Sequence, residues 1–462
     1  MIGHQAIQQR TEIPPKTKGF STAGAVAQSV ATKFAIIGVN AATGIITARV
    51  LMPAGRGELA AMILWPVFLA NALTLGIPSA LTFQLKSTPK KGSELLGTAF
   101  LLAVFTSAIA ILLGILFMHS WIPQYSAKTI LYAQVFLVSA PLTSLINTGR
   151  AAFQTRNDFW AVNGLLAVPP AITLVVLLGF LATHTLTPYT AAFAYVPAGI
   201  VPAAWMMWRL WKLYRPTVKG LQESVRCLFS YGVRSYGIDL CGTMALYVDQ
   251  AVVVRFLEPD AMGTYVVALS LSRMLNAFHT SVVLVLFPRA VSQSSATIRE
   301  MTSRAMRMST LLTVSAGAII IALGPEVLTL LYGSEYRNAT TVLRILVVEV
   351  VLSGATLVLS QAFMAIGRPG VITALQLTGL LLSLPLMILL VPRFGIVGAG
   401  MALLISTTTR FVCLLVSFPV FLKMQVPQFL PRRSDLEYMV DVAMKYMSQI
   451  SGRNLRAAEE MD

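Results

Sequence analysis

Apolar stretches long enough to cross a bilayer recur along almost the whole chain. A helix needs about 20 consecutive apolar residues to span roughly 30 Å of hydrocarbon. Runs of this length begin at Phe20 and continue to Leu422, and polar segments separate them. Because an isolated span in lipid must satisfy its own backbone, each run predicts a helix. The twelve predicted spans are 20–48, 58–85, 94–118, 129–149, 159–183, 189–211, 227–254, 262–288, 308–332, 341–366, 371–391 and 395–422.

The composition supports an all-α integral membrane protein. Of the 462 residues, 56% are hydrophobic and only 12% are charged, whereas a soluble domain carries about 25% charged residues. A soluble enzyme is therefore excluded, as are collagen-like and disulfide-rich chains. The three cysteines lie in or beside apolar runs, which favours packing over metal binding. The polar first twenty residues predict no cleavable signal peptide.

Lysine and arginine are concentrated in the termini and in every second link between spans. This distribution predicts that the termini and the even-numbered links face the cytoplasm. Arg150, directly after the fourth span, is assigned to one of these links. The formal charge of +16 is spread over membrane-flanking segments, which anionic headgroups explain without nucleic acid. In the C-terminal tail, an apolar stripe from Leu436 to Ile450 predicts a surface helix, with a partner-docking helix as the alternative.

Two segments of the chain resemble each other at an offset of 206 residues. Arg49, Leu51, Pro53 and Gly57 match Arg255, Leu257, Pro259 and Gly263. The match predicts a duplicated six-span unit whose copies are related by an axis along the membrane normal, although chance similarity between apolar helices is the alternative. The predicted divisions are a cytoplasmic tail (1–19), an N-lobe (20–211), a linker (212–226), a C-lobe (227–422) and a cytoplasmic tail (423–462).

Ionisable residues within the predicted spans are the candidate functional groups. A charge at the bilayer centre costs at least about 2.5 kcal/mol and is usually turned toward a partner or a wet cavity. Polar residues on several spans share helix faces with these charges, which predicts one water-filled cavity between the lobes. The candidates for substrate binding are Lys33, Asn40, Arg234, Arg273, Asn276 and Arg410. Guanidinium groups bind phosphate oxygens bidentately, so an anionic cargo is favoured.

Three acids within the spans are candidates for carrying a coupling ion, namely Asp239, Asp249 and Glu349. Lys33 aligns with Asp239 at the repeat offset, so a structural Lys33–Asp239 pair is an alternative to a substrate role. Arg410 has a comparable alternative, in which it extends to the interface or binds a carbonyl. No nucleotide-binding Gly-x-x-x-x-Gly-Lys loop and no metal-ligand spacing are found in the sequence. We therefore expect neither a cofactor nor a metal, and no primary pump.

Three segments resemble polysaccharide flippases of the multidrug/oligosaccharidyl-lipid/polysaccharide exporter superfamily. They are the Arg-x-Leu-x-Pro-x-x-x-Gly sequence at 49–57, Leu-Leu-Tyr-Gly-Ser-Glu-Tyr at 330–336 before Leu-Arg-Ile-Leu at 343–346, and Val-Pro-Arg-Phe-Gly-Ile-Val-Gly-Ala-Gly at 391–400. The resemblance extends from Phe20 to Leu422. It implies twelve helices in two six-helix lobes around a central cavity.

The same resemblance implies a function. Such flippases move an undecaprenyl-diphosphate-linked O-antigen, capsule or exopolysaccharide unit to the periplasmic leaflet of the bacterial inner membrane by alternating access. Glycan polymerases or other assembly proteins would be partners, and H⁺ or Na⁺ a coupling ion. Cationic residues that hold the diphosphate in this family would correspond to Lys33, Arg234 and Arg273. A cation-coupled drug antiporter of the same superfamily and a noncatalytic scaffold for glycan assembly are the alternatives.

Overall fold

A computed structural model describes residues 22–290 and 294–429, and these residues form helices and connecting turns without a β-strand. Helix starts follow local capping signals. Ser126, Asp158 and Ser294 each precede a helix and accept a hydrogen bond from a backbone amide of its first turn, which satisfies a donor that the helix itself cannot.

The helices follow one another along the chain with short connections. Their bounds are α1 (Thr22–Ala72), α2 (Ile77–Ser87), η1 (Pro89–Lys91), α3 (Gly92–Trp121), α4 (Ala127–Phe136), α5 (Ser139–Thr155), α6 (Phe159–Ala182), α7 (Pro188–Phe193), α8 (Tyr195–Tyr214), α9 (Leu221–Phe256), α10 (Pro259–Arg273), α11 (Asn276–Ala290), α12 (Ser295–Leu331), η2 (Ser334–Ala339), α13 (Thr340–Ala365), α14 (Pro369–Ser417) and η3 (Phe418–Leu422).

Nine helices in the described part of the chain are long and apolar enough to cross a membrane, or ten if the bent α9 is counted as one span. The first of these, Ala31–Ser87, contains 57 residues, which would extend about 86 Å if straight. This length exceeds one crossing because α1 turns back at Met52, whose φ of 58° is not helical. Helix α14 is interrupted in the same way at Gly395. Met52 falls between two predicted spans and Gly395 is the first residue of the last one, so both kinks lie at predicted boundaries. Twelve crossings remain the prediction.

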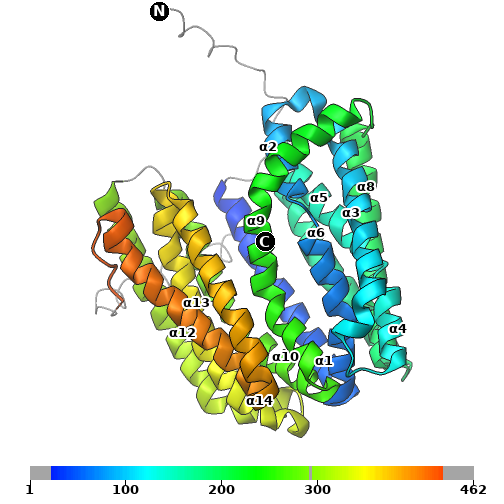
Figure 1. Cartoon of the computed structure of the whole chain (residues 1–462), viewed down its shortest axis with the longest axis vertical. Helices are drawn as coiled ribbons and strands as arrows, with labels where there is room; N and C mark the ends of the chain where they lie inside the picture. The colour runs from blue at the N-terminus through cyan, green and yellow to red at the C-terminus, as the bar shows by residue number, and fades with distance from the viewer. Residues whose placement is uncertain (1–21, 291–293, 430–462) are drawn as a thin grey trace, which may run out of the picture.

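The helices form two lobes that meet at one end of the molecule. Helices α3 to α8 lie on one side and α12 to α14 on the other (Figure 1). One apolar core joins residues of both lobes, including Leu59, Met62 and Leu343. Two further cores lie within single lobes, one around Phe153 and the other around Phe363. The lobes thus share a core at one end, which we call the Gly57 end, and pack separately at the other.

The Gly57 end is closed by the two copies of the repeated motif, which contact each other. A Cβ atom at Gly57 would lie 1.7 Å from the carbonyl oxygen of Pro259, and a Cβ atom at Gly263 would lie 1.9 Å from that of Pro53. Only glycine allows two helix backbones to approach so closely. Because Pro53 and Gly57 match Pro259 and Gly263 at the repeat offset, the contact is reciprocal. Reciprocity of this kind indicates a pseudo-two-fold axis between α1 and α10, as the duplication predicts.

Polar contacts between the lobes add to this closure. The Tyr336 hydroxyl donates to the carbonyl of Ala48 at 3.1 Å, and the Arg49 guanidinium donates to the carbonyls of Leu330 and Leu331. These interactions join the end of the first predicted span to the last residues of α12 and to η2. They satisfy carbonyl groups that a helix end leaves without partners.

Helix α9 contacts both lobes, although the sequence assigns it to the C-lobe. Its first half packs on the N-lobe, where Gly232 lies against Gly76 and the Tyr236 hydroxyl donates to the carbonyl of Ala72. Its second half packs on α10, where Asp249 accepts a hydrogen bond from Tyr265. The division predicted at residue 227 therefore crosses a helix that joins the lobes.

Both predicted tails lie largely outside the described residues. The N-terminal tail (1–19) and the amphipathic helix predicted between Leu436 and Ile450 are among them. The described start of the C-terminal tail lies beside α12, where Arg299 donates to Gln425 at 2.8 Å.

Candidate functional site

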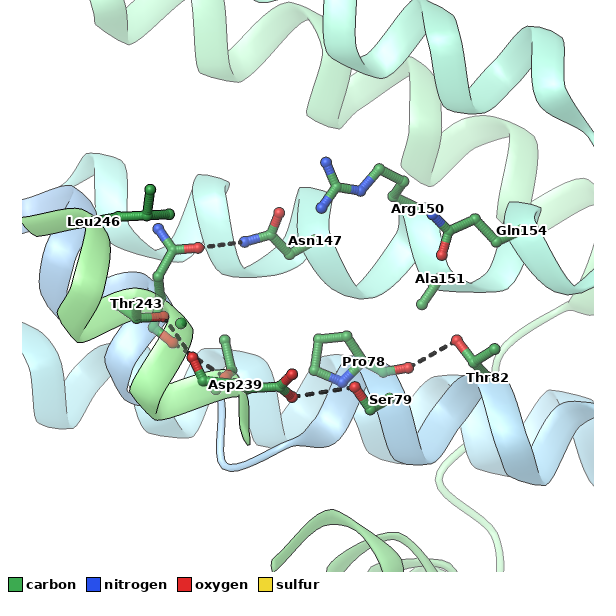
Figure 2. Close-up of a pocket in the computed structure, with 13 residues that line it drawn as sticks. Pro78, Ser79, Thr82, Asn147, Arg150, Ala151, Gln154, Asp239, Thr243 and Leu246 are labelled. Carbon is green, nitrogen blue, oxygen red and sulfur yellow. Dashed lines mark hydrogen bonds between the residues drawn. The ribbon is translucent and has the colours of Figure 1, made fainter. Parts of the chain in front are cut away.

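A polar cavity of about 430 Å³ lies within the N-lobe and against α9. Figure 2 shows Asn147, Arg150 and Gln154 of α5 along one wall and Ser79 and Thr82 of α2 along the other. Residues of α9 close one end. The full lining is Asn71, Thr74, Pro78, Ser79, Thr82, Asn147, Arg150, Ala151, Gln154, Asp239, Gly242, Thr243 and Leu246.

A break in the second predicted span shapes one wall of this cavity. Helix α1 ends at Ala72 and α2 begins at Ile77, and both Leu75 and Gly76 between them have positive φ. Gly76 is required for a second reason, since a Cβ atom there would lie 2.3 Å from the carbonyl oxygen of Gly232. Broken helices are tolerated at membrane depth where they line a cavity or are buried in protein. The break places Ser79, in the first turn of α2, on the cavity wall.

Hydrogen bonds within the cavity fix the positions of some lining side chains, and other lining groups can still bind a ligand. The Ser79 hydroxyl donates to the Asp239 carboxylate at 3.1 Å, and the Asn147 amide donates to the Asn71 side chain at 3.2 Å. The Thr82 and Thr243 hydroxyls donate to carbonyls of their own helices. Each of these hydroxyls and carboxylates retains acceptor capacity that a ligand can use.

Arg150 is a cavity residue that the sequence interpretation missed. The sequence predicts it in a cytoplasmic link, whereas the helix continues through it to Thr155. Asn147, Arg150 and Gln154 are spaced at i, i+3 and i+7 and so share one face of α5, which was a signal available in the sequence. Among the described residues Arg150 forms no hydrogen bond or ion pair, and Asp239 is not within ion-pair distance.

A second polar cluster lies in the C-lobe around Asp249. This carboxylate is fully buried, accepts a hydrogen bond from Tyr265 at 2.9 Å and forms an ion pair with Arg273 at 3.3 Å. Arg273 retains 32% exposure of its side chain and also lies 3.4 Å from the carbonyl of Leu246. Since Leu246 lines the N-lobe cavity, Arg273 lies directly beside the α9 turn that closes that cavity.

Glu349 and Arg410 extend this cluster across α13 and α14. Glu349 accepts a hydrogen bond from Thr407 at 2.7 Å, and Arg410 donates to Ser353 at 3.4 Å. Both Arg410 and Arg273 lie within electrostatic range of the Glu349 carboxylate. The C-lobe cluster, by which we mean Asp249, Arg273, Glu349 and Arg410, is therefore a set of mutually interacting charges.

The structure brings together only part of the predicted site. Asp249, Arg273, Glu349 and Arg410 are neighbours, and Asp239 lies apart from them in the N-lobe cavity. Asn276 begins α11 and is half-buried. Lys33, Asn40 and Arg234 are exposed, and no side-chain bond to a described residue is found for them. One cavity shared by all of these residues stays a prediction.

The predicted alternative of a Lys33–Asp239 pair is not what the structure shows for the described residues, since no ion pair joins the two side chains. Asp239 instead accepts its hydrogen bond from Ser79 of α2. For Arg410, the structure places the guanidinium beside Ser353 and Glu349.

Comparison with known proteins relates the chain to proteins of glycan biosynthesis. The profile of a family described as polysaccharide biosynthesis protein matches residues 46–341. A probable low-salt glycan biosynthesis flippase of Haloferax volcanii is 28% identical over 238 residues, which cover 51% of this chain and 50% of that protein. The chain thus aligns with about half the length of this curated relative.

Solved structures show the same fold. The lipid II flippase MurJ in an inward closed conformation matches with a TM-score of 0.73 at 14% identity, covering 92% of this chain and 93% of that one. The inward-facing conformation of a multidrug resistance MATE family transporter of the MOP superfamily matches with a TM-score of 0.64 at 15% identity, covering 84% and 95%. The predicted all-helical fold of this superfamily is therefore confirmed.

Proposed function

Since the chain belongs to the polysaccharide biosynthesis protein family, we propose that it is a flippase that moves a lipid-linked oligosaccharide across the membrane rather than an enzyme that modifies one. The observation that carries this proposal is the pair of lobes joined through Gly57 and Gly263 at one end and packed around separate cores at the other. Two lobes related by a pseudo-two-fold axis and hinged in this way can alternate their opening between the two faces of the membrane.

We infer the orientation of the protein in the membrane from the charge distribution. Because lysine and arginine mark the termini and the even-numbered links as cytoplasmic, the Gly57 end is the outer one. The conformation described here would then receive cargo from the cytoplasmic side. The finer proposal is an undecaprenyl-diphosphate-linked O-antigen, capsule or exopolysaccharide unit in a bacterial inner membrane. A matching relative comes from Haloferax volcanii, which is an archaeon. The identities of the lipid carrier and of the glycan are therefore the first properties to measure.

Within the C-lobe cluster, Arg273 is the base that we assign to the anionic part of the cargo. It is the partly exposed member of an ion pair whose acid is fully buried, so one face of the guanidinium is free to bind phosphate oxygens. Lys33 and Arg234 are exposed cations, and their charges would add to the electrostatic attraction for an anionic cargo. Arg410, Asn40 and Asn276 remain candidate binding residues without an assigned contact.

The proposal is tested by reconstitution of the purified protein in vesicles that contain a fluorescent polyprenyl-diphosphate-linked oligosaccharide. With the protein present, the pool in the inner leaflet should become accessible to a membrane-impermeant glycosidase, whereas protein-free vesicles should protect it. Equal protection in both preparations would contradict the flippase. Export of cationic drugs without any flipping would favour the antiporter alternative, and a noncatalytic scaffold would move neither.

We assign ion coupling to Glu349, with Asp249 and Asp239 as the other acids that could carry H⁺ or Na⁺. Glu349 lies between Thr407 and two guanidinium groups, so a change in its charge would alter the whole cluster. Replacing Glu349 by glutamine keeps a side chain that can bind Thr407 but removes the titration. We expect the variant to lose the stimulation of flipping by an imposed pH gradient while retaining gradient-independent exchange.

The control for this prediction is Glu326→Gln, which alters an exposed carboxylate near the end of α12 and should leave the gradient response unchanged. Vesicle flipping rates measured with and without the gradient give both results. An undiminished gradient response in Glu349→Gln would remove this residue from coupling.

A further inference from the structure

The N-lobe cavity is lined by hydrogen-bonding groups of several kinds, together with one cationic and one anionic side chain. Amides and hydroxyls provide both donors and acceptors on its walls. Arg150 and Asp239 are its two ionisable groups, and they do not pair with each other. Such a lining matches a neutral group that carries many hydroxyls, because each hydroxyl can donate to a carboxylate or amide oxygen and accept from an amide or guanidinium.

The same lining is unfavourable for a diphosphate. A doubly charged group would approach the Asp239 carboxylate, and the cavity contains a single cation to compensate. The phosphate can instead lie outside the cavity at Arg273, whose guanidinium lies 3.4 Å from the carbonyl of Leu246 on the α9 turn that lines the cavity. The two sites are therefore adjacent.

The size of the cavity also fits a sugar. Its volume of about 430 Å³ is within the range of small-molecule pockets, about 300–1,000 Å³. At about 30 Å³ per water molecule it holds on the order of a dozen waters, which leaves enough room for a sugar ring with its hydroxyls. A long oligosaccharide would have to extend beyond it.

We propose that this cavity is a carbohydrate subsite that binds one sugar of the lipid-linked glycan, while Arg273 binds the neighbouring phosphate. The assignment rests on the proposed function and adds to it a separate site for the sugar. Asn147, Arg150 and Gln154 present three hydrogen-bonding side chains from a single face of α5, opposite Ser79 and Thr82 of α2 (Figure 2). The α5 face therefore selects which sugar is accepted.

The binding experiment uses a cysteine on the opposite wall. Thr82 lines the cavity and its hydroxyl bonds only to its own helix, so Thr82→Cys should preserve the fold. A polyprenyl diphosphate that carries one sugar should protect this cysteine from a maleimide, whereas the same lipid without a sugar should not. Equal protection by the two lipids would show that the cavity binds phosphate and would overturn the proposal.

Selectivity is measured with Gln154→Leu, which removes both a donor and an acceptor from the α5 face. We expect flipping of the sugar-bearing lipid to fall about tenfold, with little change for the sugar-free diphosphate lipid. The matched control is Gln134→Leu, because Gln134 lies outside the cavity and donates to the carbonyl of Ile115. An equal loss for both lipids, or no loss for either, would contradict a sugar subsite.

The two proposals fail in different ways. If the sugar-bearing lipid protected Thr82→Cys but the wild-type protein flipped nothing, the flippase assignment would be wrong and the subsite would stand. If it flipped the lipid while no sugar protected Thr82→Cys, the subsite would be wrong and the flippase would stand.

Discussion

Replacing Gly57 by alanine is expected to abolish closure of the Gly57 end and to reduce flipping at least tenfold. The added methyl group would lie 1.7 Å from the Pro259 carbonyl oxygen, on a backbone that cannot rotate away. Overpacking of this kind costs about 3 kcal/mol at the upper end of its usual range, which shifts the ratio of closed to open molecules about 100-fold. Gly263→Ala should have the same effect, because the contact is reciprocal.

A buried cysteine reports this opening directly. Thr47 is fully buried close to the Gly57 end, so Thr47→Cys should resist an impermeant maleimide added from outside unless Gly57→Ala is also present. Gly44→Ala is the matched control, because a Cβ atom at Gly44 would meet no atom within 4 Å. Unchanged labelling and unchanged flipping in Gly57→Ala would mean that this close contact is not what holds the Gly57 end closed.

Arg273→Ala is expected to lose flipping and about 3 kcal/mol of stability. The stability loss arises because Asp249 is fully buried and would keep a charge without its ion-pair partner. Thermal unfolding in nanodiscs and the vesicle assay measure the two effects. A single variant cannot separate a structural role of Arg273 from a role in binding cargo.

The double variant Arg273→Ala with Asp249→Asn makes this separation. Asparagine at position 249 can still accept the Tyr265 hydrogen bond but leaves no buried charge, so stability should recover. If Arg273 binds the cargo phosphate, flipping should remain absent. Restored flipping in the stable double variant would show that Arg273 only compensates Asp249.

Part of the candidate site could be predicted because buried charge is expensive in lipid wherever it occurs. This rule identified Asp249, Arg273, Glu349 and Arg410, which the structure places together. The rule does not indicate how exposed each charged side chain is or how far apart the helices that carry them lie. Lys33 and Asp239 match at the repeat offset, yet Asp239 bonds to Ser79 because the break before α2 brings that hydroxyl onto α9.

Arg150 was missed for a different reason. Hydropathy locates the hydrocarbon-crossing part of a helix, and α5 continues beyond that part through Arg150 to Thr155. A basic residue at the end of an apolar run is read as a sign that this end of the span faces the cytoplasm. Its position on a cavity wall depends on α2 and α9, which are distant in the sequence.

The amino-acid sequence by itself determined the membrane environment, the helical secondary structure and the internal repeat, because these follow from hydropathy and local residue patterns. It also identified the matching residues Gly57 and Gly263. Only the tertiary structure decided that these glycines contact each other, that α9 joins both lobes and that the polar cavity lies between α2 and α5. The physical reason is that contacts between helices depend on kinks and backbone approach, which periodicity within one helix does not encode.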